Sequence, residues 1–383
     1  MTLLLTPTED GGIRISAHED GADGSVLPPA PPSATALVEG RGALLRWRID
    51  GSATPTALVL HPGIAQEWLA DVYGDEVAEA VRSVAPADSP RTLPADEGPL
   101  RAELRRWAHL SWARSWWPAG LALPPLSAGL IDAERILLTA GLEHLLDDED
   151  AVVRALADGR AALAALAAAP SPVSAESDAL ARTLVGLAED YGVDLEAASA
   201  PTPVVASAGS APRARDDWAL AAGGATGAPG RAVASGTAAV PWAAVPAQTL
   251  HADADARWAI LADAGTHTLR IEADAVAGGE AGPLRARFGP DPRHSPPRGV
   301  EVVLRHDGER FAGEVPVSVE TLILPVARRT LRIWDERMTP VPLDPEPAEV
   351  RDAVLRFAAA RVADPWSLAE RALSAEDAPE ATA

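Results

Sequence analysis

The hydrophobic pattern of this chain changes its period partway along, and that change limits the folds open to it. Between residues 64 and 191 the apolar residues recur at helical spacing, in segments that proline or glycine separates. Between residues 257 and 334 they alternate with polar residues, as in strands that have one buried face. At 383 residues the chain is also too long for a single ordinary core, so more than one domain is expected.

The N-terminal part combines a few strands with a series of helices. Strands are expected at about 11–16, 43–49 and 56–61, next to glycine, proline or serine. From Ile64 onward the period is helical, and the helices end at prolines, glycines and an acidic turn. The predicted helices cover about 64–84, 97–117, 128–146, 150–168 and 174–191.

The C-terminal part has the short alternating segments of an antiparallel sheet. Two pairs of segments flank the turns Asp263-Ala-Gly265 and Asp307-Gly308, which is typical of hairpins. Roughly seven such segments favour a small β-sandwich or barrel, followed by a helix at about 347–362. The expected strands are 257–261, 267–272, 283–288, 300–305, 311–317, 321–324 and 330–334.

A stretch rich in Ala, Gly, Ser, Pro and Thr separates the two parts and is expected to be a flexible linker. The predicted fold is therefore α+β and multidomain, with a mainly helical N-terminal domain and a small antiparallel β-sandwich-like C-terminal domain that carries a terminal helix. The predicted boundaries are an N-terminal arm with a Pro-rich linker at 1–34, the mainly helical domain at 35–195, the disordered linker at 196–240, the β-rich domain with its helix at 241–365 and a polar tail at 366–383.

The basic and sulfur-containing residues exclude several classes of enzyme. All 33 basic residues are arginines, which excludes Schiff-base chemistry on a lysine, Walker-type nucleotide hydrolysis and lysine-dependent kinase activity. The chain has no cysteine, which excludes thiol nucleophiles, iron–sulfur clusters, cysteine-bound zinc and disulfides.

Charge and hydropathy indicate the surroundings in which the chain works. The formal net charge of −22 repels phosphate groups, so neither nucleic acid nor an anionic membrane is expected as a partner. No signal peptide is expected at the start, and no apolar run is long enough to span a bilayer. Together with the absence of cysteine, this predicts an acidic protein of the cytoplasm.

The most distinctive segment is the tryptophan-rich sequence RRWAHLSWARSWW at 105–117. On a helical wheel Leu104 and Trp107 lie on one side, and the opposite side is also apolar. One interpretation is a central helix of the core, with arginine stems packed on indole rings. The other is a surface that binds a protein or ligand, because tryptophan and arginine dominate interface energies. The candidate interaction residues are Arg105, His109, Trp112 and Trp116.

Other polar motifs point to no cofactor or metal. The strand, turn and helix around His61 resemble, over a few residues, the His-Gly turn of α/β-hydrolases, but no Gly-x-Ser-x-Gly motif follows. The acidic run Glu143–Asp150 lacks the ligand spacing of a calcium loop or a di-iron site, so it is interpreted as the boundary between two helices. No catalytic residue is therefore assigned.

The function predicted from the sequence is a non-enzymatic protein–protein interaction or scaffold module. Its arginine-, alanine- and proline-rich composition indicates a GC-rich genome, and an accessory role in a bacterial multi-protein system is expected, with a protein partner and an open oligomeric state. Two alternatives remain: a hydrolase-like enzyme with a dispersed site around His61 or His109, and binding of a small ligand or carbohydrate by the β-rich domain through Trp258 or Trp334.

Overall fold

The computed structural model describes residues 2–17, 31–51, 53–83, 89–94, 96–148, 150–195, 231–263, 265–277, 282–290, 299–337 and 344–376. Within these residues no helix is long and apolar enough to cross a lipid bilayer. The chain divides into two compact units. Unit 1 contains Met1–Ala197, Pro241–Asp253 and Leu343–Ala383, and unit 2 contains Ala198–Val240 and Ala254–Pro342.

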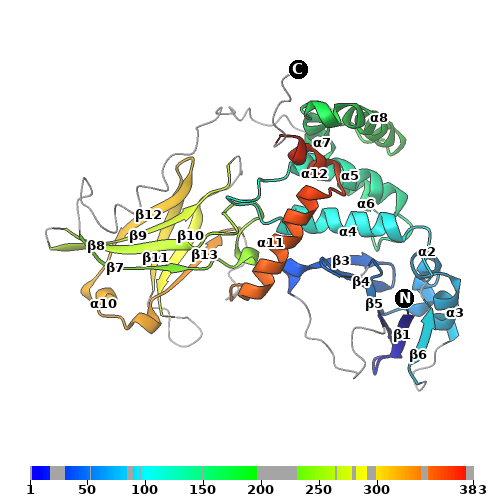
Figure 1. Ribbon diagram of the computed structural model, residues 1–383, viewed down its shortest axis with the longest axis horizontal. Helices are drawn as coiled ribbons and strands as arrows, with labels where there is room; N and C mark the ends of the chain where they lie inside the picture. The colour runs from blue at the N-terminus through cyan, green and yellow to red at the C-terminus, as the bar shows by residue number, and fades with distance from the viewer. Residues whose placement is uncertain are drawn as a thin grey trace. The chain divides into compact units, whose positions relative to one another are not determined.

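Unit 1 is built on an antiparallel sheet of six strands in the order β3-β4-β5-β2-β1-β6 (Figure 1). Alternate residues of the strands are buried, such as Leu3 and Leu5 in β1 and Ile13 and Ile15 in β2, which gives the sheet an apolar face. Strands β1 and β2, which fall in the expected N-terminal arm, therefore belong to the sheet. The strands are β1 (Thr2–Pro7), β2 (Ile13–Ala17), β3 (Thr35–Gly40), β4 (Ala43–Arg48), β5 (Thr56–Val59) and β6 (Arg91–Pro94).

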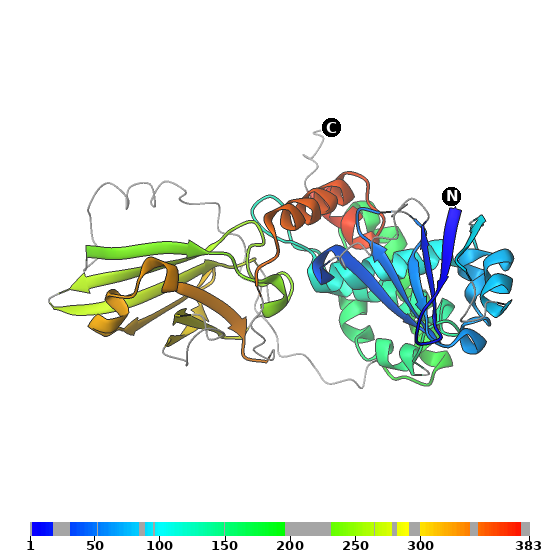
Figure 2. The ribbon, with the colours of Figure 1, turned by 90° about the horizontal axis from the view of Figure 1, so that it is seen from below.

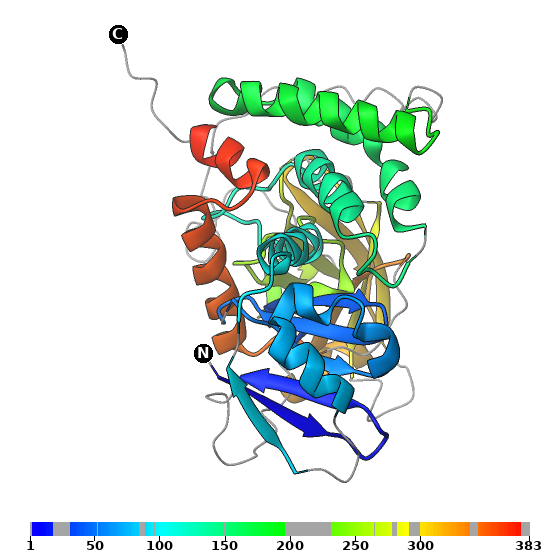
Figure 3. The ribbon, with the colours of Figure 1, turned by 90° about the vertical axis from the view of Figure 1, so that its right-hand side faces the viewer.

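Helices complete unit 1, and α4 packs against the edge strand β3 on one side and against α5 on the other (Figure 3). Helix α5 also contacts α6, α7, α8 and α12, so it lies at the centre of the helical part. The helices are α1 (Pro62–Ala65), α2 (Leu69–Tyr73), α3 (Asp75–Ser83), α4 (Arg101–Trp116), α5 (Ala128–Gly141), α6 (Ala151–Leu156), α7 (Gly159–Ala167), α8 (Ser174–Asp190), α11 (Ala348–Ala363) and α12 (Leu368–Glu376).

The segment 241–253 belongs to unit 1 and is fastened there by backbone hydrogen bonds. The amide of Ala252 donates to the carbonyl of Ala119 at 2.8 Å. The Asp253 carboxylate accepts hydrogen bonds from the amides of Leu121 and Ala122 at 3.2 and 3.3 Å. These contacts explain why the segment leaves the β-rich part of the chain.

The last helix, α12, is attached to unit 1 through a capping box. Ser367 and Glu370 stand three residues apart, and each accepts a hydrogen bond from the other's amide, at 3.2 and 3.0 Å. The buried carboxylate of Glu134 on α5 accepts a further hydrogen bond from the amide of Leu368 at 2.8 Å. The free amides at the start of α12 are thus satisfied by two buried acids.

Unit 2 is a single antiparallel sheet of seven strands in the order β13-β10-β11-β12-β9-β8-β7. Figure 2 shows this sheet in green, yellow and orange, seen from below. The edge strands β13 and β7 approach each other, so the sheet curls into a half-barrel. Its buried face includes Trp258, Phe288 and Phe311. The strands are β7 (Arg231–Ala238), β8 (Ala256–Asp263), β9 (Thr266–Asp274), β10 (Leu284–Gly289), β11 (Val300–His306), β12 (Arg310–Pro316) and β13 (Thr330–Asp335).

The fold class predicted from the sequence was wrong. Unit 1 is not a mainly helical domain, because a six-stranded sheet forms its base, and unit 2 is one curled sheet and not a sandwich. The terminal helix α11 belongs to unit 1 and not to the β-rich domain, because it packs against α12 and the 3-10 helix at Pro32–Ala34. Strands of four to six residues such as β3 and β6 are too short for their hydrophobic period to stand out.

Two local predictions also need correction. The expected linker includes residues 231–238, which form strand β7 and pair with β8, while 196–230 lie outside the described residues. The expected strand at 321–324 is instead the end of the short helix α10 (Val319–Leu322) and the turn after it. Most of the Pro-rich run at 27–32 also lies outside the described residues.

Candidate functional site

Three of the four interaction residues expected on the tryptophan-rich helix, Arg105, His109 and Trp112, belong to one aromatic cluster with Phe357 and Trp366, and the fourth, Trp116, lines a separate small cavity. Trp112 is only 2% exposed, and its indole N–H donates to the carbonyl of Ser33 at 2.8 Å. Its ring packs edge-on against Phe357 of α11, with centroids 5.4 Å apart. Trp112 therefore joins α4 to the segment before β3 and to α11.

His109 takes part in a buried pair with Glu370 of α12. The distance from Nε2 to Oε1 is 2.6 Å, and the side chains are 4% and 0% exposed. Burial by itself raises the pKa of the Glu370 carboxyl. The hydrogen bond and charge of His109 and the amides of Trp366 and Ser367 outweigh burial and hold that pKa below its usual range. Neither side chain is open to a substrate.

Arg105 and Trp116 are both half-buried. The Arg105 guanidinium lies 4.5 Å from the ring centroid of Trp366, and burial followed by the charge of Arg361 lowers the pKa of Arg105. Trp116 lines a small cavity of about 30 Å³ together with Trp242 of the 241–253 segment. The structure thus does not gather the four residues into one surface, and their role in binding a partner stays a prediction.

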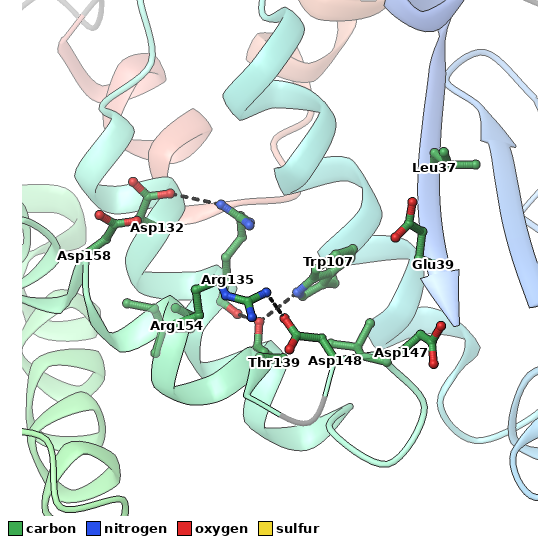
Figure 4. Close-up of a pocket in the computed structure, with 14 residues that line it drawn as sticks. Leu37, Glu39, Trp107, Asp132, Arg135, Thr139, Asp147, Asp148, Arg154 and Asp158 are labelled. Carbon is green, nitrogen blue, oxygen red and sulfur yellow. Dashed lines mark hydrogen bonds and ion pairs between the residues drawn. The ribbon is translucent and has the colours of Figure 1, made fainter. Parts of the chain in front are cut away.

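A larger cavity, of about 480 Å³, opens between β3, α4, α5 and α6, and we call it the acidic groove (Figure 4). Leu37 and Glu39 of β3 form one wall, Asp132 and Arg135 of α5 form the other, and Trp107 of α4 lies between them. The lining residues are Leu37, Glu39, Trp107, Asp132, Arg135, Ile136, Thr139, Leu146, Asp147, Asp148, Ala151, Arg154, Ala155 and Asp158.

Backbone hydrogen bonds between β3 and the loop after α5 bring the acidic residues of the groove together. The amide of Arg41 donates to the carbonyl of Leu145 at 2.8 Å, and the amide of Asp147 donates to the carbonyl of Glu39 at 3.2 Å. The Trp107 indole N–H donates to the Thr139 hydroxyl at 2.9 Å, which fixes the ring between the walls. The groove is therefore a preformed part of the fold.

Five carboxylates and two guanidinium groups line the acidic groove. Asp132 is paired with Arg135 at 3.2 Å, and Asp148 with Arg154. The remaining three, Glu39, Asp147 and Asp158, have no ion-pair partner among the described residues, and all three are exposed. The groove thus has an excess of negative charge that a cationic group could neutralise.

The charge of the whole chain is concentrated in the same unit. Unit 1 contains 40 Asp and Glu against 18 Arg, whereas unit 2 contains 15 of each, so the net charge of −22 belongs to unit 1. No group of three or more potential metal ligands occurs among the described residues. The acidic groove therefore has the electrostatics of a surface that attracts basic groups.

The acidic groove is also lined by apolar side chains that could contact a partner. Leu37 is 53% exposed at its rim although it lies on a strand. The guanidinium of Arg135 lies 5.8 Å from the centroid of Trp107 and covers part of the indole ring. The aliphatic surface between the acids therefore comes from Leu37 together with Ile136 and Ala155. An occupant with both apolar and cationic groups would be complementary to such a surface.

The two alternative sites suggested by the sequence lie outside the acidic groove. His61 is exposed at the start of α1, and the acidic groove contains no histidine. Trp258 is buried on the inner face of unit 2 with its ring 4.7 Å from that of Phe288, and Trp334 is half-buried. The enzymatic and carbohydrate-binding alternatives therefore stay predictions.

Of the charged groove residues, the sequence had drawn attention only to Asp147 and Asp148, which lie in the acidic run, and the tryptophan-rich segment had included Trp107. Glu39, Asp132 and Asp158 come from separate elements, and only the packing of β3 beside α4 and α5 brings them near that run. Comparison of the chain with protein-family models, with curated proteins and with solved structures found no match.

Proposed function

We propose that this protein is a non-enzymatic protein–protein interaction module and that the acidic groove of unit 1 is its docking surface. The observation that carries the proposal is a preformed groove with three carboxylates that have no ion-pair partner among the described residues, beside the exposed Leu37 and the Trp107 ring. Groups of this kind bind a partner by complementarity and need no reactive atom.

The chemistry of the groove defines the partner it fits. A protein segment that carries arginine or lysine next to aliphatic residues would neutralise the carboxylates and cover Leu37 at once. Nucleic acid would be repelled by the same carboxylates. A role as an accessory component of a bacterial multi-protein system fits a surface of this kind and is part of the proposal.

The long tryptophan-rich helix has a supporting role in this proposal. Through Trp112 and His109 it ties the segment before β3 and both C-terminal helices to the body of unit 1. Trp107 on the same helix lies in the groove and donates to Thr139. The helix therefore fixes the geometry of the groove from within.

The proposal is tested by photo-crosslinking from the groove in cells of the native host. A photoreactive benzoylphenylalanine is placed at Leu37 in the groove, and a matched control carries it at Leu121, which is 63% exposed and not a groove residue. We expect a discrete crosslinked protein product from position 37 and not from position 121, with the adduct mapped to a basic segment of the partner.

A charge reversal completes the experiment. Glu39→Arg should abolish the product at position 37 by repelling a basic segment, whereas Glu189→Arg, an equal change of charge at an exposed position of α8, should leave it in place. Identical products from positions 37 and 121, or a product that survives Glu39→Arg, would refute the docking role of the groove.

A further inference from the structure

Unit 2 carries the three most exposed large apolar side chains among the described residues. They are Val319, Ile323 and Val326, with exposures of 64%, 74% and 80%. All three lie in the connection between β12 and β13, which contains α10 and the 3-10 helix Val326–Arg328 (Figure 1). We call residues Val319–Arg329 the apolar knob. Clustered apolar exposure of this kind is typical of a surface that binds something.

The apolar knob is held in shape by its own hydrogen bonds. The guanidinium of Arg329 donates from Nε to the carbonyl of Leu324 and from Nη2 to the carbonyl of Leu322, both at 2.9 Å. The amide of Arg328 donates to the carbonyl of Pro325 at 2.8 Å, and Thr321 is buried beneath. Because the backbone is already ordered, little conformational entropy is lost when the knob binds.

The apolar knob contains one exposed carboxylate, Glu320, and two arginines, Arg328 and Arg329, so its net charge is +1 where that of the groove is negative. The Arg328 side chain is exposed, two residues from Val326, and has no ion-pair partner among the described residues. The knob therefore presents aliphatic groups next to a guanidinium, which is the combination that Leu37, Trp107 and the unpaired carboxylates of the acidic groove would accept.

We propose that the apolar knob of one copy of this chain binds in the acidic groove of a second copy. The inference rests on the proposed function, because it names the partner of the same groove. Knob and groove are different surfaces, so each contact leaves one groove and one knob unoccupied at the two ends of a pair. Self-association by this route adds further copies head to tail, or closes into a ring.

The test uses two variants that are each unable to assemble alone. Ile323→Glu with Val326→Glu disables the knob and keeps the groove, and Glu39→Arg with Asp147→Arg disables the groove and keeps the knob. Sedimentation velocity of the wild-type chain should show a mass that increases with concentration from that of a monomer to that of a closed pair or a larger assembly. Each variant alone should be a monomer, with self-association weakened by at least about tenfold.

Mixing the two variants gives the decisive measurement. The intact knob of the groove variant can enter the intact groove of the knob variant, and neither complex can extend, so an equimolar mixture should form a 1:1 dimer and nothing larger. A control variant, Leu121→Glu, should assemble like the wild type, and circular dichroism confirms that every variant is folded. Salt should weaken the mixed dimer, because the contact includes opposite charges.

A wild-type chain that stays monomeric at concentrations up to about 1 mM would overturn the inference, since such a contact would be weaker than any specific assembly needs. A mixture of the two variants that contains only monomers would overturn it as well. Both outcomes are distinguishable from failure of the proposed function, because crosslinking from Leu37 to another protein would still identify the groove as a docking surface.

Discussion

Loss of the Glu370 side chain should destabilise unit 1 and leave unit 2 unchanged. Its Oε1 is 2.6 Å from His109 Nε2, and its Oε2 accepts hydrogen bonds from the amides of Trp366 and Ser367 at 2.6 and 3.0 Å. The carboxylate is fully buried. The Glu370 carboxylate thus pairs with the His109 ring of α4 and accepts hydrogen bonds from the two amides that precede α12.

The magnitude follows from what Glu370→Ala would leave behind. Losing a helix cap costs about 1 kcal/mol, and leaving the buried His109 ring without its hydrogen-bond partner costs about 1–3 kcal/mol. The two losses share one side chain and do not add fully, so we expect the free energy of unfolding of unit 1 to fall by about 2–3 kcal/mol. Glu370→Gln keeps an acceptor for the amides and should cost about 1–2 kcal/mol.

Urea unfolding followed by circular dichroism measures this change, and hydrogen exchange assigns it. The amides of 366–376 should lose protection, while those of unit 2 should keep theirs. The control is Glu349→Ala at an exposed position of α11, which should change stability by less than about 0.5 kcal/mol. If Glu370→Ala were as mild as Glu349→Ala, the buried pair would not be what attaches α12.

The effect of Glu370 should also depend on pH in a definite direction. Its pKa is lower in the folded chain than its ordinary value of about 4.3, so its contribution to stability is complete above that value. The contribution is lost as the pH falls through the folded pKa. The stability difference between the wild type and Glu370→Gln should therefore be largest near neutral pH and shrink below about pH 4. A constant difference from pH 7 to pH 3 would contradict the assignment of the lowered pKa.

Three further substitutions test the packing elsewhere. Trp112→Phe should lower the free energy of unfolding by about 2 kcal/mol, because the carbonyl of Ser33 loses its indole donor at 2.8 Å. Urea unfolding measures this change, and a neutral effect would mean that this hydrogen bond contributes nothing. Gly236→Ala should lower the free energy of unfolding of unit 2 by about 1–2 kcal/mol, since a Cβ there would lie 2.7 Å from Cζ2 of the buried Trp258. A gain in thermal stability would refute the contact. Arg329→Ala should speed hydrogen exchange across the apolar knob severalfold without changing unit 1, and unaltered exchange would show that the guanidinium does not hold the knob.

Several parts of the architecture follow from local sequence alone. The helical period and its breakers place α4, α5 and α8 within a few residues of their observed bounds, because a helical pattern over 14–17 residues between proline or glycine breakers is a strong signal. The hairpin of β8 and β9 follows from alternation on both sides of a glycine turn. The Ser367–Glu370 spacing is a capping-box pattern that could have located α12.

Long-range packing decided the rest. Strands β3 and β6 join a six-stranded sheet only because neighbouring strands supply their hydrogen bonds, and the segments 241–253 and 344–376 return to unit 1 through contacts far apart in sequence. The tryptophan-rich helix could have faced a core or a partner, and its period fits both. The acidic groove likewise required Glu39, Asp132 and Asp158 to come together from separate elements, which a one-dimensional pattern of residues does not encode. Local sequence set the identity and length of the long helices, and the tertiary structure set which of their faces are buried and where the unpaired charges meet.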